Sequence, residues 1–228
     1  TLIELTGIEP IEKKKTITYQ ELEMIIEVVK NRERANSFKS DSIGIALYIG
    51  YYSGLRISEV LALEKSDFDF INNEIHITKQ LDCVGKHKDE ISVKAKLKTS
   101  ASNATIPLAE PLKEILIDWF NKNPYNHVIC DVDGDYIPSP SIRSIKPYIK
   151  NALGIDFHFH MLRHTFISNL ANNGISLQIA KELARHSDIT TTMNIYTHVN
   201  EDSQKQAINS VFGSKSAKKV SKPTFLTN

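Results

Sequence analysis

The hydrophobic pattern of this chain changes period twice, from helical to alternating and back to helical. Up to about residue 60, and again from Pro111 onward, apolar residues recur every three or four positions, which is typical of amphipathic helices. Between about residues 67 and 108 they alternate with polar residues, as Ile75 and Ile77 do, which is typical of half-buried strands. The pattern therefore predicts a mainly α chain with a small antiparallel β-sheet, an α+β fold.

The N-terminal helices have clear boundaries in the sequence. Thr18 and Glu21 have the spacing of a capping box, which predicts a helix over about 19–32. The nearly continuous apolar run 43–52 is typical of a buried helix, and Gly54 is placed to end it. A further helix is expected to open directly after this glycine.

The second alternating run, over about 91–98, has two unlike faces. Its apolar residues alternate with Ser92 and with three lysines, so one face of the strand is apolar and the other is basic. Lys98 ends this strand at the edge of a polar turn, with Lys94 and Lys96 behind it on the same face. The turn leads into a short strand over 105–108.

The C-terminal half is predicted to be helical with one hairpin. The expected elements are a helix from Pro111, a hairpin at 128–137, a helix near 141–152 and three close-set helices over 160–198, the last of which carries Tyr196. Gly174 is placed to end the first of the three, and Ser176 to cap the second. Ile179 is expected on the buried face of that second helix.

Composition limits the classes of protein to which the chain can belong. Hydrophobic residues make up 41% of its 228 residues, which suits a folded body. The 28 basic residues almost balance the 27 acidic ones, so any surface for nucleic acid has to be local. Two cysteines without C-x-x-C spacing, and the lack of any signal-like or membrane-length apolar segment, predict an intracellular protein in a reducing compartment.

Three segments concentrate groups that could act in catalysis, and each also has a simpler interpretation. Arg56 and Glu59 lie on one helix face and could be an ordinary surface ion pair. His160 and Arg163 could cap a helix or form a salt bridge. His186 falls at a predicted helix end, where histidine is favoured by the helix dipole. Taken singly, none of the three defines a site.

Taken together and in this order, the segments resemble the tyrosine recombinase family, in particular its phage and mobile-element integrases. The resemblance covers about residues 18–200. It rests on Gly-Leu-Arg-Ile-Ser-Glu at 54–59, Lys98 before a strand ending Ile-Pro-Leu, His-x-x-Arg-His at 160–164, His-Ser-Asp at 186–188 and Thr-Met-Asn-Ile-Tyr-Thr-His at 192–198. Five ordered motifs at matching separations are far more specific than any one of them.

The resemblance implies a role for each matching residue. The catalytic residues would be Arg56, Lys98, His160, Arg163, His186 and the nucleophile Tyr196. Glu59 would orient Arg56 or a histidine. Lys94, Lys96 and Arg185 are candidates for contacts with the DNA backbone. Arg185 stands where the family usually has the glycine of a Leu-Gly-His run, and a solvated side chain is its simpler interpretation.

The implied function is site-specific DNA recombination. Two arginines would hold the scissile phosphate, and Tyr196 would attack it to form a 3′-phosphotyrosyl link that rejoins without ATP, metal or any other cofactor. His160 is the candidate base and Lys98 the candidate acid. The implied partners are double-stranded DNA with a specific site, further copies of the chain in a tetramer, and accessory bending or excision factors, in the cytoplasm of a bacterial cell. A type IB topoisomerase-like strand transferase and an idle DNA-binding module are the alternatives.

The same resemblance suggests a domain organisation. Residues 1–17 would be a linker from a missing upstream core-binding domain, 18–212 the catalytic domain and 213–228 a flexible tail rich in lysine and serine. The stretch 201–212 could form a helix that packs on a neighbouring copy or back on its own chain. Without the upstream half, we expect weak DNA binding with a steep dependence on salt.

Two possible metal signals are discounted. The aspartates of 131–135 resemble the start of a calcium loop, but Ile142 stands where such a loop needs glutamate, so a hairpin turn is the better interpretation. The histidines near the C-terminus do not repeat the spacing of a zinc site. No metal site is therefore expected.

Overall fold

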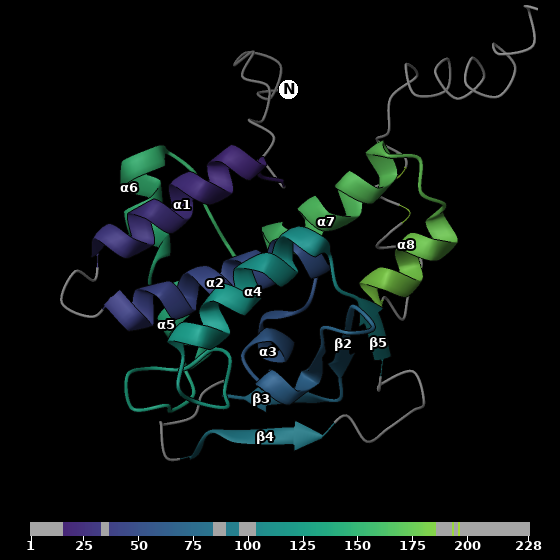
Figure 1. Cartoon of the computed structure of the whole chain (residues 1–228). Helices are drawn as coiled ribbons and strands as arrows, with labels where there is room; N and C mark the ends of the chain where they lie inside the picture. The colour runs from purple at the N-terminus through teal and green to yellow at the C-terminus, as the bar shows by residue number, and fades with distance from the viewer. Residues whose placement is uncertain are drawn as a thin grey trace, which may run out of the picture.

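Helix α2 (Ser37–Ser53) lies at the centre of the helical part of the molecule, and helices α1 (Tyr19–Arg32), α4 (Glu110–Lys122) and α7 (His160–Asn172) pack against it (Figure 1). The computed structural model describes residues 16–32, 37–83, 90–95, 104–185, 193 and 196. Because α2 is enclosed by other elements, it buries residues all around its axis, as the apolar run 43–52 predicts.

The predicted start and end of the first helix are confirmed. Helix α1 covers Tyr19–Arg32, and the Thr18 backbone N–H donates to the Glu21 carboxylate at 2.8 Å while the Glu21 N–H donates to Thr18 Oγ1 at 3.2 Å. This is the reciprocal pair of a capping box. The helix buries one apolar face against α2 and α6 (Lys146–Leu153), and that face consists of Leu22, Ile25, Ile26 and Val29.

The strands form two small antiparallel sheets rather than the single predicted one. Strands β1 (Phe68–Asp69), β2 (Glu74–Ile77) and β5 (Ala104–Pro107) make a sheet in the order β1-β2-β5, while β3 (Lys79–Asp82) pairs with β4 (Ser92–Ala95). Strand β4 lies at the lower edge of the molecule in Figure 1. Its expected apolar face is only partly buried: Ile91, directly before the strand, packs against the core, whereas Val93 is 39% exposed.

The predicted helix near 141–152 is two helices. Helix α5 (Ser139–Arg143) ends before Ser144, and α6 begins at Lys146. Pro147 has no N–H with which to bond the carbonyl of Arg143 four residues earlier, so the chain cannot continue as one regular helix through this point. The predicted hairpin turn is confirmed, because the Asp131 carboxylate accepts from the Asp133 and Asp135 N–H groups.

The last described helices meet at a short turn. Gly174, with φ of 72°, follows α7, and Ser176 caps α8 (Leu177–Ala184) by accepting from the Ile179 N–H at 3.3 Å. The prediction for the Ile179 side chain is wrong: it is 49% exposed, because α8 turns its alanines, including Ala180, toward α7. The segments 201–212 and 213–228 lie outside the described residues, as does nearly all of 1–17.

One continuous apolar core joins the helices to the three-stranded sheet. It extends from Ile17 and the buried face of α1 through α2 to Ile75, Ile77 and Ile106 of the sheet. No helix among the described residues is long and apolar enough to cross a membrane. The core fixes the ends of α2 and α7 relative to one another, α8 packs on α7, and the candidate residues lie at the ends of these helices.

Candidate active site

The turn between α2 and the short helix α3 (Ile57–Val60) depends on Gly54. This glycine has φ of 63°, in the left-handed region, and a Cβ atom added to it would lie 2.5 Å from the ring of Phe166 on α7. A side chain at this position would therefore be both strained and obstructed. The close approach lets the Gly54 carbonyl oxygen accept a hydrogen bond from Arg163 Nη1 at 2.6 Å.

Arg163 is buried at the junction of three helices. Its Nη1 donates to the carbonyl of Gly54, directly after α2, and its Nη2 donates to the carbonyl of Ala184, the last residue of α8. Carbonyl groups at helix C-termini carry partial negative charge and lack partners within the helix. Burial, followed by the charge of Arg56, lowers the pKa of Arg163 to about 10, so the guanidinium stays protonated at neutral pH.

Glu59 lies buried between two arginines. Its Oε2 accepts from the Arg56 backbone N–H at 3.0 Å, and its Oε1 accepts from Arg56 Nη1 at 3.2 Å. Both oxygens also bind Arg185, each at 3.1 Å. The Arg56 side chain remains 43% exposed. Glu59 thus holds the backbone and one guanidinium nitrogen of Arg56, while the Arg56 side chain keeps access to solvent.

His160 opens α7, beside the two site arginines. Its ring lies 4.7 Å, centroid to centroid, from that of His164, one helical turn away. Partial burial, followed by the charges of His164 and Arg163, lowers the pKa of His160 to about 4. The imidazole is therefore neutral at physiological pH and has a lone pair with which to accept a proton.

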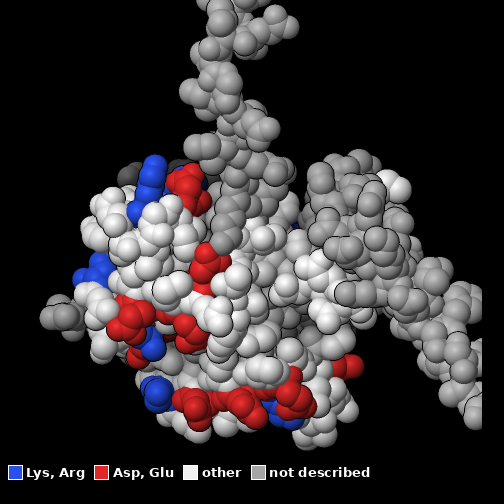
Figure 2. Space-filling view, turned by 90° about the horizontal axis from the view of Figure 1, so that it is seen from above, with Lys and Arg blue, Asp and Glu red and all other residues white. Residues whose placement is uncertain are grey.

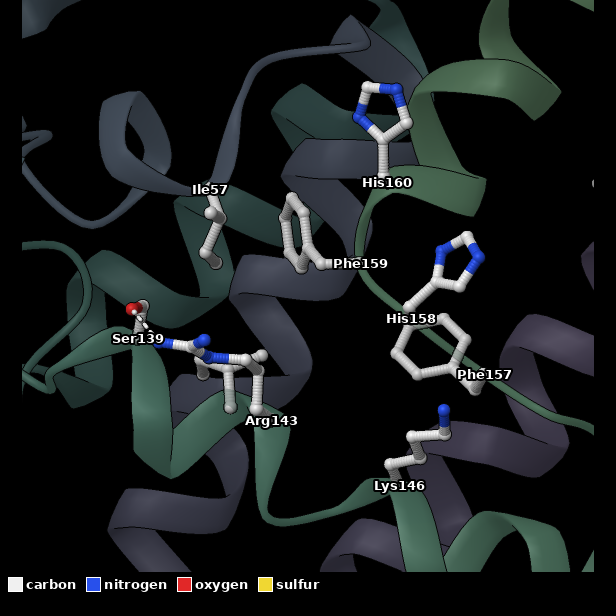
Figure 3. A pocket seen from close by; sticks show the side chains of 9 residues that line it. Ile57, Ser139, Arg143, Lys146, Phe157, His158, Phe159 and His160 are labelled. Carbon is white, nitrogen blue, oxygen red and sulfur yellow. Dashed lines mark hydrogen bonds between the residues drawn. The ribbon is translucent and has the colours of Figure 1, made fainter. Parts of the chain in front are cut away.

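A cavity of about 450 Å³ opens beside His160 (Figure 3). Apolar side chains form much of its wall, whereas Arg143, Lys146 and His158 bring basic groups to it from α5, α6 and the approach to α7. Arg143 is bonded to Ser139 Oγ at 3.2 Å. The remaining lining residues are Ile57, Ile142, Phe157 and Phe159.

Tyr196 lies against the turn between α7 and α8. Its hydroxyl donates to the Ile175 carbonyl oxygen at 2.9 Å, and partial burial raises its pKa above the ordinary value. A carbonyl oxygen can accept this hydrogen bond but cannot remove the proton. In this arrangement Tyr196 is neutral and is not activated as a nucleophile.

The candidate DNA contacts are placed differently from one another. Lys94 on β4 is 60% exposed and binds the Asp82 carboxylate at 2.5 Å. The Arg185 side chain is only 8% exposed and turns inward to Glu59. Lys96, Lys98 and His186 lie outside the described residues. Of the predicted catalytic set, the structure brings together Arg56, His160 and Arg163 with Glu59.

Sequence reasoning missed several parts of this arrangement. It did not foresee that the carbonyls of Gly54 and Ala184 anchor Arg163, since backbone groups leave no mark in the residue pattern. The basic residues Arg143 and Lys146 at the cavity were not singled out either. A signal was present for Arg185, because an arginine replaces the glycine expected at that position.

Comparison with known proteins agrees with the family and the fold. The phage integrase family profile matches residues 15–203. The tyrosine recombinase XerC of Pediococcus pentosaceus is 30% identical over 199 residues, which cover 85% of this chain and 60% of that protein. The chain thus spans about 60% of the length of this relative and about half that of several others, including a tyrosine recombinase of Thermosipho africanus.

Solved structures share the fold. The Tn1549 transposon integrase in complex with a circular intermediate DNA superposes with a TM-score of 0.68 at 21% identity, over 89% of this chain and 68% of that one. The catalytic domain of bacteriophage HP1 integrase superposes with a TM-score of 0.56 at 21% identity and is covered to 96%. The fold and the arginine-histidine site define a tyrosine recombinase catalytic domain. The chain belongs to the phage integrase family.

Proposed function

We propose that this chain cleaves and rejoins DNA at a specific site by transesterification through Tyr196. The observation that carries the proposal is the meeting of Arg56 and Arg163 beside a neutral His160. The carbonyl of Gly54, two residues before Arg56, accepts from Arg163, and burial followed by nearby positive charge, including that of Arg56, lowers the pKa of both Arg163 and His160. Two cations held this close repel each other, and a phosphodiester anion between them would relieve the repulsion.

The proposed chemistry assigns each group one task. Arg56 and Arg163 stabilise the charge on the non-bridging oxygens as the phosphorus becomes five-coordinate. Tyr196 Oη attacks phosphorus as His160 accepts its proton, and the bond from phosphorus to the 5′ oxygen breaks. Lys98 gives a proton to the departing 5′ oxygen, and His186 adds a hydrogen bond to the phosphate. The 3′-phosphotyrosyl link keeps the phosphodiester bond energy, so a 5′ hydroxyl can reverse the step without ATP or metal.

The cavity side is the expected DNA face. Figure 2 shows a surface of mixed charge on the top of the molecule, with acidic side chains gathered along one edge, which would repel phosphates. Arg143 and Lys146 are exposed at the cavity next to His160, and Arg56 is exposed directly before Ile57, which lines that cavity. DNA that places a phosphate at His160 would cross these basic side chains. Lys94 and Lys96 would add contacts from the β4 region.

The wider setting is part of the same proposal. Two DNA sites have to be brought together for strand exchange, so the active assembly would be a tetramer on DNA, in a bacterial cytoplasm and on chromosomal or mobile-element DNA. The solved relatives include an integrase in complex with a circular intermediate DNA and a XerH recombinase bound to its substrate. These complexes support DNA as the substrate class for this chain.

The test is a nicked suicide substrate, from which the short strand downstream of the scissile phosphate diffuses away after cleavage. The substrate carries a candidate attachment sequence taken from the DNA that flanks the gene. We expect a covalent protein–DNA adduct that forms in EDTA and is absent from Tyr196→Phe. Tyr148→Phe, at an exposed position on α6, is the matched control and should form the adduct. An adduct that persists in Tyr196→Phe would contradict the assignment of the nucleophile.

A further inference from the structure

Arg185 adopts a backbone conformation that an arginine ordinarily avoids. It caps the C-terminus of α8 with φ of 56° and ψ of 44°, in the left-handed region. Among the described residues, the non-glycine positions with positive φ are Asn73 and Arg185. Asparagine tolerates this region, whereas a long side chain there costs conformational energy that glycine would not. A compensating interaction is therefore expected from the Arg185 side chain.

The side chain makes that interaction with Glu59. Nη1 and Nη2 bind the two carboxylate oxygens, each at 3.1 Å, across 126 residues of sequence. The Glu59 side chain is fully buried and that of Arg185 is 8% exposed. A paired fork of this kind is directional as well as strong, because two parallel hydrogen bonds fix the plane of the carboxylate. The contact ties the end of α8 to the start of α3.

The location of Arg185 argues against a direct contact with DNA. Its Nε is buried and has no hydrogen-bond partner among the described residues. A guanidinium whose fork faces inward and whose Nε is shielded from solvent cannot also receive a phosphate without leaving Glu59. Its charge therefore acts on the neighbouring site residues.

Arg185 changes what Arg56 can do. A buried carboxylate needs strong hydrogen-bond partners. If Arg56 were the only arginine beside Glu59, both guanidinium Nη atoms of Arg56 would be bound to the Glu59 carboxylate. Because Arg185 engages both oxygens, Arg56 supplies its backbone N–H and one guanidinium nitrogen to Glu59, and its guanidinium makes no other hydrogen bond among the described residues. The rest of the Arg56 guanidinium stays available at the surface, where its side chain is 43% exposed.

The same turn also sets the position of Arg163. The carbonyl that accepts from Arg163 Nη2 belongs to Ala184, directly before Arg185. We propose that Arg185 is a positioning residue: through Glu59 and the left-handed turn at the end of α8, it holds Arg56 and Arg163 in the geometry that receives the scissile phosphate. The inference rests on the proposed function, and the experiment below separates the two.

The central variant is Arg185→Gly, which suits the left-handed turn and removes the ion pair. With the suicide substrate at saturating DNA, we expect the single-turnover cleavage rate to fall about 10- to 100-fold, the range seen when a group that orients a site residue is lost. The dissociation constant for DNA should change less than about twofold, since no phosphate contact is removed. Lys181→Gln removes a positive charge from the same helix end and should cleave at the wild-type rate.

Coupling to Arg56 distinguishes positioning from a general loss of structure. If Arg185 acts through Glu59 and Arg56, adding Arg185→Gly to Glu59→Gln or to Arg56→Lys should reduce the rate by less than about threefold further, far from the product of the single effects. Arg185→Lys, which keeps the charge without the fork, should recover only part of the rate. A melting curve of each variant confirms that it is folded.

The other outcomes are equally decisive. Wild-type cleavage by Arg185→Gly at saturating DNA would overturn the inference, as would fully multiplicative effects in the double variants. A loss confined to affinity, with a shallower salt dependence of binding, would show that Arg185 contacts a phosphate instead. If the wild-type chain forms no adduct, the proposed function fails. If the wild-type chain forms the adduct and Arg185→Gly forms it at the same rate, only the positioning role of Arg185 is contradicted.

Discussion

The Tyr196 hydroxyl donates its hydrogen to the carbonyl oxygen of Ile175, 21 residues earlier in the chain, at 2.9 Å. Tyr196, the proposed nucleophile, is thereby held by the turn between α7 and α8, with its proton in place. To attack a phosphate it has to exchange this carbonyl for a group that accepts the proton. Binding of DNA has to supply the free energy of that exchange.

Tyr196→Phe should separate chemistry from stability. We expect complete loss of the covalent adduct, with a decrease in the free energy of unfolding of only about 0.5–1.5 kcal/mol, the net contribution of one hydrogen bond. Urea unfolding followed by circular dichroism measures the second quantity. A decrease well above this range would mean that Tyr196 has a larger structural role than its hydrogen bond to Ile175 indicates.

Gly54→Ala should lower the free energy of unfolding more than the same substitution at another glycine with a left-handed backbone. Gly154 has φ of 72°, and a Cβ atom added to it would meet no atom within 4 Å, so Gly154→Ala isolates the backbone strain of about 1–2 kcal/mol. At Gly54 the added carbon also meets Phe166 at 2.5 Å and displaces the carbonyl that anchors Arg163. Unfolding curves should show that Gly54→Ala is clearly less stable than Gly154→Ala. Only Gly54→Ala should slow DNA cleavage. Equal effects of the two would contradict this account.

Arg163→Lys should lose both catalysis and stability. A single ammonium group on a flexible stem cannot hold the carbonyls of Gly54 and Ala184 together, which leaves a buried acceptor without its partner. We expect a loss of about 1–3 kcal/mol in the free energy of unfolding and a decrease of about 100-fold or more in cleavage rate. Arg32→Lys, remote from the site and bonded to Ser144 Oγ, is the control for the same substitution. Wild-type cleavage by Arg163→Lys would refute the proposed clamp.

The low pKa of His160 predicts a loss of stability in mild acid. The unfolded chain takes up a proton at this histidine near pH 6.5, whereas the folded chain does so only near pH 4. The folded state is therefore fully favoured by this group above pH 6.5 and loses that advantage as the pH falls toward 4. Comparing the unfolding free energy at pH 7.5 and 5.0, we expect a smaller decrease in His160→Gln than in the wild type. His158→Gln, which keeps His160, should retain most of the decrease.

The same pKa bears on activity. If neutral His160 accepts the proton of Tyr196, the acid limb of kcat/KM, which reports the free enzyme, should lie below pH 6.5. Measuring suicide-substrate cleavage from pH 4.5 to 8 at subsaturating DNA locates this limb. A limb at or above pH 6.5 that disappears in His160→Gln would show that the free enzyme holds the histidine in a more solvated state.

Local signals in the sequence were sufficient for the elements that they define. The Thr18–Glu21 pair located the start of α1 because a capping box is complete within four residues. The single predicted sheet became two, and Val93 and Ile179 are exposed, because alternation and helical spacing show which residues share a face but not whether another element covers that face. The order of the arginine and histidine motifs likewise indicated the family, which the comparison confirms.

What the sequence by itself determined is the set of chemical groups and their order along the chain, since residue type and local periodicity are properties of short segments. Only the tertiary structure decided how those groups are used. It buries Arg163 against two helix ends, directs Arg185 away from the surface to Glu59 and rests Tyr196 on Ile175. These contacts join residues 21 to 126 positions apart, and the packing of helices around α2, rather than any local pattern, brings such distant segments together.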